Sequence, residues 1–484
     1  MAFGYPNRNR PTIRIPCAPN AVIGPWAFLM FSCVAPPMLA STANSDTVVV
    51  HWVAVYDGPE SREDRCTGMV LAPDGSAYLA GYSFGAATDF DFAVLKVDTT
   101  GRIVWVNRYG SPIGCEDRPW CLCRDSSGDI VAAGGSIADM AVLWDFRIIK
   151  YRPTGETVWT RLLDFPTHAE DKIAGAGILS DNSIVVAGSS RYRPDHSFGP
   201  AAGSQSRADW DVTIARYSSQ GETLWTRRFD GKAHGDDLTA GLALDRTGNC
   251  YVAGQTTTAG GTEVLLLKYN PSGQLLWRRT LCGNVPGSSI GQGVIVDSAS
   301  RAWVFGACYN QGRSFDFLVA CFDSSGRQLA YLALDAAARV DICQAACLDR
   351  AGNLYATGQS TGRGTSFDVL TVKVSPAGET LWTRRFHGTG ADRGWCIGLD
   401  QFDRVVVGAT SDGPAGQPNM MLLCYGPDGE LAWTFSYAGG GAGEARPVAI
   451  ERGGENELLV AGSACRPGTD FDIVLLRLAP GGGR

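Results

Sequence analysis

The sequence predicts an all-β protein, a single eight-bladed β-propeller of four-stranded antiparallel blades. Three observations support this prediction. A segment of short strands and turns recurs about every fifty residues, a glycine turn precedes a tryptophan in nearly every copy, and the chain begins with the strand that its last copy lacks. A repeat of about this length built from short strands is typical of propellers and solenoids.

Tryptophan marks the repeat most clearly. It stands at Trp52, Trp105, Trp159, Trp225, Trp277, Trp382 and Trp433, with Ala330 in the remaining position, and successive spacings are 53, 54, 66, 52, 53, 52 and 51 residues. An indole on an outermost strand can lie on the backbone of the next blade and donate its N–H there. Ala330 lacks this contact, so we predict a weak seam at the fifth blade. Tyr331 would compensate only if the strand shifted.

Each copy reads as four strands. In residues 341–386 we expect strands at 341–348, 354–359, 368–374 and 379–386. The turns between them contain Gly and Asn, which tolerate the positive φ of tight hairpins. Four antiparallel strands in about fifty residues make one propeller blade.

The two ends of the repeat region complement each other. Residues 48–56 form a tryptophan strand with no third strand before it, and residues 471–478 form a third strand with no tryptophan strand after it. We therefore predict that residues 50–54 pair with 472–477 and close the ring. An open solenoid is the alternative, but it would require capping modules.

The first strand of each blade is expected to line the central channel. Small residues recur at one position: Gly68, Cys121, Gly175, Gly241, Gly293, Ala345, Cys396 and Pro447. They would let the blades converge on the axis. The next position is mostly larger, with Met69, Leu122, Leu242, Val294, Ile397 and Val448, and we expect these side chains to pack between blades.

Residues 1–43 have the layout of a signal peptide. Three arginines precede an apolar stretch at 21–36, and Ser41 and Ala43 would flank a cleavage site before Asn44. This predicts a leader at 1–43, a propeller at 44–484, and a secreted, periplasmic or cell-envelope location. The apolar stretch is too short for a comfortable membrane span. A plain N-terminal tail and a lipid anchor at Cys33 are the alternatives.

Composition excludes some classes of function. The chain has 484 residues, of which 45% are hydrophobic and 19% charged, and its net charge is −7. These values suit a folded protein that does not bind nucleic acid, and we expect a monomer. Fifteen cysteines are present, two of them in the leader. Most are expected to be small buried hydrophobic residues, and their pairing stays open.

Acidic residues open the first and third strands of most blades. We interpret them as turn residues that accept backbone N–H bonds. Structural calcium is a weak alternative, and its candidate ligands are the paired acids Asp89 and Asp91, Asp209 and Asp211, and Asp470 and Asp472. No other cofactor, no other metal and no catalytic residue is predicted.

One blade carries a long insertion. The 66-residue spacing arises from a loop at 190–207, between the second and third strands of the third blade. A loop that is longer than the equivalent loops of the other repeats often carries function. We predict that a partner is recognised by Arg191, Tyr192, Arg193, His196 and Phe198. The alternative is a solvent-exposed loop without a function.

The repeat resembles the bacterial SBBP-type β-propeller repeat. The matching stretches are Glu263 to Trp277 and Gly248-Asn-Cys-Tyr-Val-Ala-Gly254, and the resemblance covers about 48–478. Delta-60 repeats look similar but lack the regular tryptophan. The Gly-x-x-x-Trp spacing is also similar to that of quinoprotein propellers, whose adjacent cysteines are missing here. The SBBP resemblance implies an exported module and is nearly silent on activity.

Two functions follow as hypotheses. The first is an exported, non-catalytic binding or scaffold propeller that recognises a protein or glycan partner through its loop face. The alternative is an enzyme, a lyase, hydrolase or quinoprotein-like protein, with a site at the channel mouth. Acidic residues and histidines converging on the axis would favour the enzyme.

Overall fold

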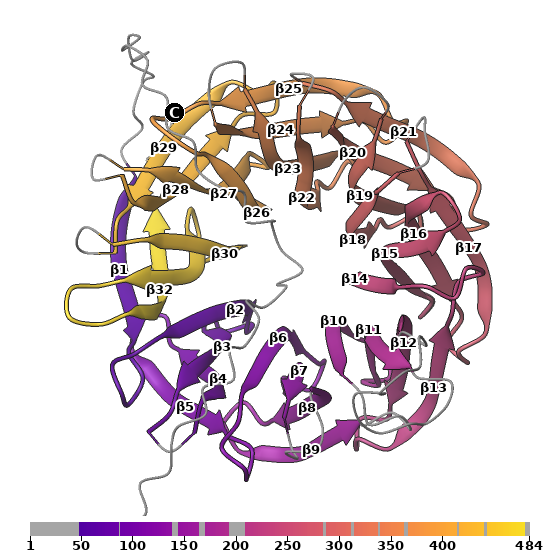
Figure 1. Ribbon diagram of the computed structural model, residues 1–484. Helices are drawn as coiled ribbons and strands as arrows, with labels where there is room; N and C mark the ends of the chain where they lie inside the picture. The colour runs from indigo at the N-terminus through magenta and orange to yellow at the C-terminus, as the bar shows by residue number, and fades with distance from the viewer. Residues whose placement is uncertain are drawn as a thin grey trace, which may run out of the picture. The chain divides into compact units, whose positions relative to one another are not determined.

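The computed structural model describes residues 48–86, 88–137, 144–163, 170–192, 209–283, 287–310, 314–336, 339–362, 366–413, 416–439 and 443–479. These residues form 32 strands and no helix. The strands make eight four-stranded antiparallel sheets arranged as blades in a ring (Figure 1). The predicted eight-bladed propeller is therefore confirmed.

Four sets of strands build the blades, and we number blades from 1 (β2–β5) to 8 (β30–β32 with β1). The first strands are β2 (Asp64–Leu71), β6 (Asp117–Arg124), β10 (Asp171–Ile178), β14 (Asp237–Leu244), β18 (Ile290–Val296), β22 (Asp341–Leu348), β26 (Arg393–Leu399) and β30 (Ala445–Arg452). The second are β3 (Ala77–Phe84), β7 (Ile130–Ser136), β11 (Ile184–Tyr192), β15 (Cys250–Thr258), β19 (Ala302–Tyr309), β23 (Leu354–Thr361), β27 (Val405–Asp412) and β31 (Leu458–Cys465).

The third and fourth strands lie progressively farther from the axis (Figure 1). The third strands are β4 (Phe90–Val97), β8 (Asp145–Tyr151), β12 (Asp209–Tyr217), β16 (Gly261–Tyr269), β20 (Phe315–Phe322), β24 (Phe367–Val374), β28 (Pro418–Tyr425) and β32 (Phe471–Ala479). The fourth are β5 (Ile103–Tyr109), β9 (Thr157–Leu163), β13 (Thr223–Phe229), β17 (Leu275–Leu281), β21 (Gln328–Leu334), β25 (Thr380–Phe386), β29 (Leu431–Tyr437) and β1 (Val49–Tyr56).

The ring closes through the two ends of the repeat region. β1 pairs antiparallel with β32, and Val50, Val53 and Ala54 lie opposite Leu478, Leu476 and Leu475. This is the contact that the sequence predicted, and it excludes the open solenoid. Because β1 covers the outer edge of β32, blade 8 has four strands like the others.

The first strands are innermost, and each contains a β-bulge (Figure 1). The small residue predicted for the channel follows the bulge in blades 1 to 7. A Cβ on Gly175 would lie 2.6 Å from the Cβ of Leu242 in the next blade, so a larger residue would not fit. Blade 8 corrects the sequence alignment, because the bulge places Ala449 in that register and Pro447 two positions earlier.

The hydrophobic core lies between blades, as a sheet that is buried on both faces requires. One cluster, for example, joins Val131 and Phe146 of blade 2 to Ile173 and Val186 of blade 3. The larger first-strand residues pack in or against such clusters, as predicted. In blade 8, Ile450 holds the position equivalent to Met69, because Val448 is the bulge residue.

Tryptophans seal the seams between blades. Six of the seven indole N–H groups donate to a turn carbonyl of the next blade: Trp52 to Thr99 (3.2 Å), Trp105 to Pro153 (3.0 Å), Trp159 to Ser219 (3.0 Å), Trp225 to Pro271 (3.0 Å), Trp277 to Ser324 (3.1 Å) and Trp382 to Pro427 (3.0 Å). The buried N–H of Trp433 has no hydrogen-bond partner among the described residues. The ring lies on the turn glycine of that blade. Gly429, for example, has a φ of 85°, and a Cβ there would lie 2.9 Å from the Trp382 ring. The predicted docking contact is confirmed.

An arginine two residues after the tryptophan strengthens four of these seams. Its Nε donates to the carbonyl of the same turn glycine: Arg161 to Gly221 (2.7 Å), Arg227 to Gly273 (2.6 Å), Arg279 to Gly326 (2.5 Å) and Arg384 to Gly429 (2.7 Å). The Trp-x-Arg spacing recurs in the sequence at these four positions. Indole and guanidinium together bind one turn of the neighbouring blade.

The seam between blades 5 and 6 lacks the indole, as predicted from Ala330. Ala330 packs directly against Gly378, and the strand keeps the register of its siblings. Tyr331 does not compensate, because its hydroxyl reaches back to the carbonyl of Cys282 after blade 4 (3.3 Å). Instead, Arg301 donates to the Pro376 carbonyl (2.7 Å), the acceptor that an indole would have used.

Candidate functional site

The connections between strands fall on two opposite faces of the ring. Because the strands alternate in direction, the loops from second to third strand and those from one blade to the next lie on the same face, which we call the loop face. The insertion at 190–207 belongs to this face, between β11 and β12. Residues 193–208 lie outside the described part of the chain, so predictions on Arg193, His196 and Phe198 fall outside it as well.

The acids that open the first strands are structural. Asp64, Asp117 and Asp392 are fully buried, and each accepts a backbone N–H from the preceding interblade loop at 2.6 Å. Hydroxyls of the second strand complete their environment, as Ser136 does for Asp117 and Ser360 for Asp341. Burial raises the pKa of Asp64, Asp117 and Asp341 to about 6. These residues therefore cap turns, as the first interpretation held.

The two rows of acids meet at the blade junctions. Among the described residues, four junctions bring three ligand-type side chains together: Asp57, Asp64 and Asp472; Asp211, Asp230 and Asp237; Asp316, Asp335 and Asp341; and Asp368, His387 and Asp392. Arginines already pair with several of these acids. Arg385 lies 2.7 Å from Asp368, and Arg466 lies 3.3 Å from Asp472.

Only some of the six candidate calcium ligands belong to these three-ligand groups. Asp91 pairs with Arg108 at 2.8 Å, and neither it nor Asp89 joins a three-ligand group in the described residues. Asp472 and Asp211 belong to such groups, whereas Asp209 and Asp470 do not. Arginines pair with Asp91, Asp211 and Asp472 among these candidates.

A small hollow lies at the base of the insertion in blade 3. It has a volume of about 250 Å³ and is lined by Tyr192, Asp209, Asp211, Arg228, Asp230 and His234. Arg228 stacks on Tyr192 at 3.6 Å from the ring centre, and its Nε donates to Asp211 at 2.6 Å. Burial raises the pKa of Asp211 to about 6, although Arg228 opposes this. Asp230 binds His234 and raises the pKa of its imidazole.

Arg191 lies beside this hollow but is engaged elsewhere. Its guanidinium lies 5.1 Å from the ring centre of Trp210 and 3.9 Å from Glu170. Lys172 approaches the same indole at 4.9 Å. Tyr192 thus joins the hollow directly, while Arg191 packs on the strand that follows the insertion.

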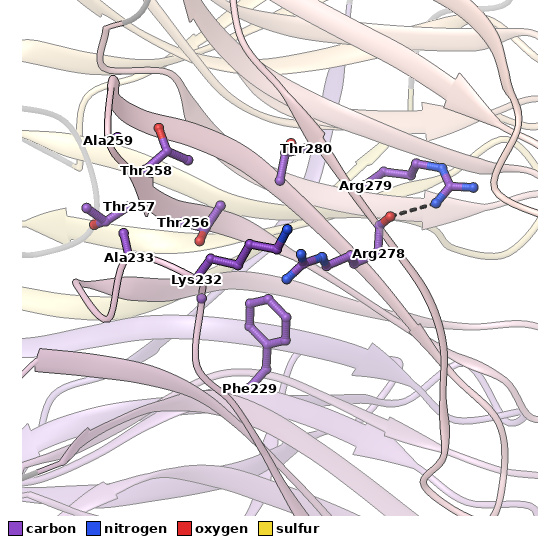
Figure 2. A pocket seen from close by; sticks show the side chains of 11 residues that line it. Phe229, Lys232, Ala233, Thr256, Thr257, Thr258, Ala259, Arg278, Arg279 and Thr280 are labelled. Carbon is purple, nitrogen blue, oxygen red and sulfur yellow. Dashed lines mark hydrogen bonds between the residues drawn. The ribbon is translucent and has the colours of Figure 1, made fainter. Parts of the chain in front are cut away.

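A larger hollow lies next to it, between blades 3 and 4 (Figure 2). It has a volume of about 670 Å³. Its lining comes from the interblade loop after β13, the end of β15 and the end of β17, and includes Lys232, Arg278 and four threonines: Thr256, Thr257, Thr258 and Thr280. Sequence reasoning missed this site, because its residues lie in three separate strands and loops.

The channel mouth carries a second feature that the sequence did not reveal. The residue two positions before the first-strand bulge is a cation in five consecutive blades, 7, 8, 1, 2 and 3: Arg393, Arg446, Arg65, Arg118 and Lys172. Three of them pair with a glutamate two positions earlier: Arg65 with Glu63 (2.8 Å), Arg118 with Glu116 (3.1 Å) and Lys172 with Glu170 (2.7 Å). Arg446 stacks on Trp395 at 3.6 Å, and burial lowers its pKa to about 10.

The axial arrangement bears on the enzyme alternative. Within the described residues, the one three-ligand group that contains a histidine is that of Asp368, His387 and Asp392, which lies at a blade junction. There Asp368 is paired with Arg385 and Asp392 accepts the Gly388 N–H. The convergence of acids and histidine on the axis that would have favoured an enzyme is not seen in this part of the chain.

The cysteines behave as the composition suggested. All thirteen in the described part of the chain are free thiols, and seven of them are buried, including Cys321, Cys396 and Cys424. Five are half-buried, including Cys121 and Cys347, and Cys282 is exposed. Burial raises the pKa of Cys66, Cys347 and Cys396 to about 12, which keeps these thiols protonated. Cys33 lies outside the described residues.

Comparisons with known proteins identify no family. No family model matches the chain, and no curated protein matches it. Similar solved structures include an acylaminoacyl peptidase of Pyrococcus horikoshii, with 12% identity, a TM-score of 0.44, and coverage of 82% of this chain and 57% of that chain. Drosophila plexin A in complex with semaphorin 1b shares 10% identity, with a TM-score of 0.42 and coverage of 90% and 88%.

A gluconolactonase of Xanthomonas campestris shares 16% identity, with a TM-score of 0.30 and coverage of 64% of this chain and 95% of that chain. These proteins differ widely in what their names describe, and none of them indicates an activity for this chain. In the part of the chain that the structure describes, no helix has the length and apolar character needed to cross a membrane.

Proposed function

We propose that the protein is an exported, non-catalytic binding or scaffold propeller that recognises a protein or glycan partner through its loop face. The observation that carries this proposal is the position of the two hollows. Both open at the junction of blades 3 and 4, beside the strands that flank the insertion. Long loops on a rigid propeller are suited to recognition, because the scaffold holds them in place.

A loop replacement tests the proposal. Residues 193–208 would be replaced by the Ala259-Gly260 turn that joins β15 to β16 in blade 4. The matched control shortens residues 138–143, the corresponding loop of blade 2, in the same way. We expect wild-type protein and control to retain a partner from cell-envelope extracts or on a glycan array, and the blade 3 variant to lose it. Retention by the blade 3 variant would refute the role of this loop.

Export rests on the sequence of residues 1–43. The basic, apolar and small-residue segments support cleavage before Asn44, and the alternative is lipid attachment at Cys33. N-terminal sequencing of the protein purified from its native host distinguishes them. A mature chain that begins at Asn44 supports free secretion, and one that begins at a lipidated Cys33 supports the anchor. An intact Met1 in the native host would overturn both. Membership of the SBBP-type repeat proteins is part of the same proposal.

A further inference from the structure

Blade 4 departs from its siblings around the larger hollow. The residue after the seam tryptophan is threonine in four blades, Thr160, Thr226, Thr383 and Thr434, but it is Arg278 in blade 4. The second exception lies in the interblade loop. Five residues before the aspartate that opens the first strand, blades 1 and 2 have a proline, Pro59 and Pro112, whereas blade 4 has Lys232. Neither change is needed for the blade to fold, because the siblings fold without it.

Both exceptional cations point into one hollow. Lys232 and Arg278 line it together, and Figure 2 shows both side chains directed into the space above Phe229. Arg278 lies 6.0 Å from the Phe229 ring centre. Within the described residues, neither cation has a carboxylate at ion-pair distance, whereas Arg228 and Arg385, near the ends of the outer strands of blades 3 and 6, are paired with Asp211 and Asp368.

The lining carries no carboxylate among the described residues. Asp237 and Glu263 lie opposite Thr256 on the two neighbouring strands, but neither of them lines the hollow. Asp237 is fully buried and accepts the Gly231 N–H. Two unpaired cations without a nearby lining acid form a site for an anion.

Loop lengths explain why the hollow is open. β15 and β16 are joined by a tight turn with the Thr258 hydroxyl donating to the Gly261 carbonyl at 3.0 Å. In blade 3, residues 193–208 separate the corresponding strands β11 and β12. The shortest such connection therefore stands beside the longest, and the space of about 670 Å³ falls within the usual range for ligand sites.

The lining indicates the kind of ligand. Four threonines line the hollow: the hydroxyls of Thr257 and Thr258 donate to the carbonyls of Asp236 and Gly261 and can still accept, and the Thr280 hydroxyl has no hydrogen-bond partner among the described residues. The apolar residues of the lining are Phe229, Ala233 and Ala259. A hydroxyl-rich, anionic ligand fits this chemistry better than a peptide, whose side chains need apolar pockets. A peptide could add to the open edge of β17, but all outer strands offer such an edge.

We propose that the hollow between blades 3 and 4 binds an anionic oligosaccharide. Its carboxylate or sulfate group would lie between Lys232 and Arg278, and its hydroxyls would bind the threonines. This inference rests on the proposed binding function and names the ligand class for the same face of the ring.

Calorimetry with defined glycans tests the inference. The probes are oligogalacturonate, dextran sulfate and neutral dextran, with polyglutamate as an acidic peptide. The variants are Arg278→Thr and Lys232→Pro, which restore the residues of sibling blades. Arg327→Thr is the matched control, because it removes an exposed cation from the opposite face, where Arg327 pairs with Asp323. Thermal unfolding verifies that each variant is folded.

We expect the two anionic glycans to bind and neutral dextran not to bind. Arg278→Thr and Lys232→Pro should each weaken binding about tenfold or more, while Arg327→Thr leaves it unchanged. Binding should also weaken as salt is raised. Equal binding of neutral dextran, tighter binding of polyglutamate, no binding of either anionic glycan, or unchanged affinity in Arg278→Thr would overturn the inference.

The two proposals fail separately. If the anionic glycans do not bind but shortening of residues 193–208 still abolishes partner capture, the oligosaccharide site is wrong and the binding function stands. If the shortened variant retains its partner, the role of the loop is wrong whatever the calorimetry shows.

Discussion

The seams between blades make a quantitative prediction at Trp382. Its side chain is 7% exposed, its indole N–H donates to Pro427, and its ring covers Gly429. Truncating a buried tryptophan to alanine costs about 3–5 kcal/mol, and loss of the hydrogen bond contributes about 1 kcal/mol of this. Because the indole lies at a blade edge, we expect Trp382→Ala to lower the free energy of unfolding by about 3 kcal/mol.

Urea-induced unfolding measured by circular dichroism checks this value. The matched control is Leu381→Ala, which removes a neighbouring side chain that is 50% exposed. A surface truncation of this kind changes stability by about 0.5 kcal/mol or less. If Trp382→Ala cost no more than Leu381→Ala, the seam would not depend on the indole and the reasoning would be refuted.

Four further predictions concern other parts of the ring. Arg301→Ala should lower the free energy of unfolding by about 1–3 kcal/mol, because the Pro376 carbonyl loses its donor at the seam without an indole; an unchanged urea midpoint would contradict this. Burial raises the pKa of Asp117 from 3.8 to about 6, so the folded protein binds this proton more tightly than the unfolded chain, and this residue's contribution to stability falls as pH rises from about 4 to 6. Asp117→Asn should make the melting temperature depend less on pH over that range, and the same pH dependence in variant and wild type would count against this. A thiol reagent should label Cys282 first in the native protein, since its side chain is exposed; mass spectrometry that finds another site labelled earlier would disprove this. A chelator should leave the melting temperature unchanged, because Arg228 already neutralises Asp211; a clear fall would reveal a structural ion.

The sequence alone was sufficient for the architecture, because the information is local and repeated eight times. Strand and turn patterns recur within each copy, and the missing strand at each end predicted that residues 50–54 pair with 472–477, where Val53 lies opposite Leu476. The tryptophan contacts were predictable for the same reason. A glycine turn and an indole at fixed spacing can meet only between neighbouring blades.

The tertiary structure decided what depends on register and on contacts between separate strands. The bulge in β30 placed Ala449 where counting along the chain had placed Pro447. Arg301 replaced the missing indole from the turn before β19, whereas Tyr331 lies in β21. Lys232 and Arg278 meet in one hollow although 45 residues separate them in the sequence, because the ring brings an interblade loop beside an outer strand. Repetition encodes the blade, but a site arises where one blade departs from the others, and only the packing of blades shows which departures lie together.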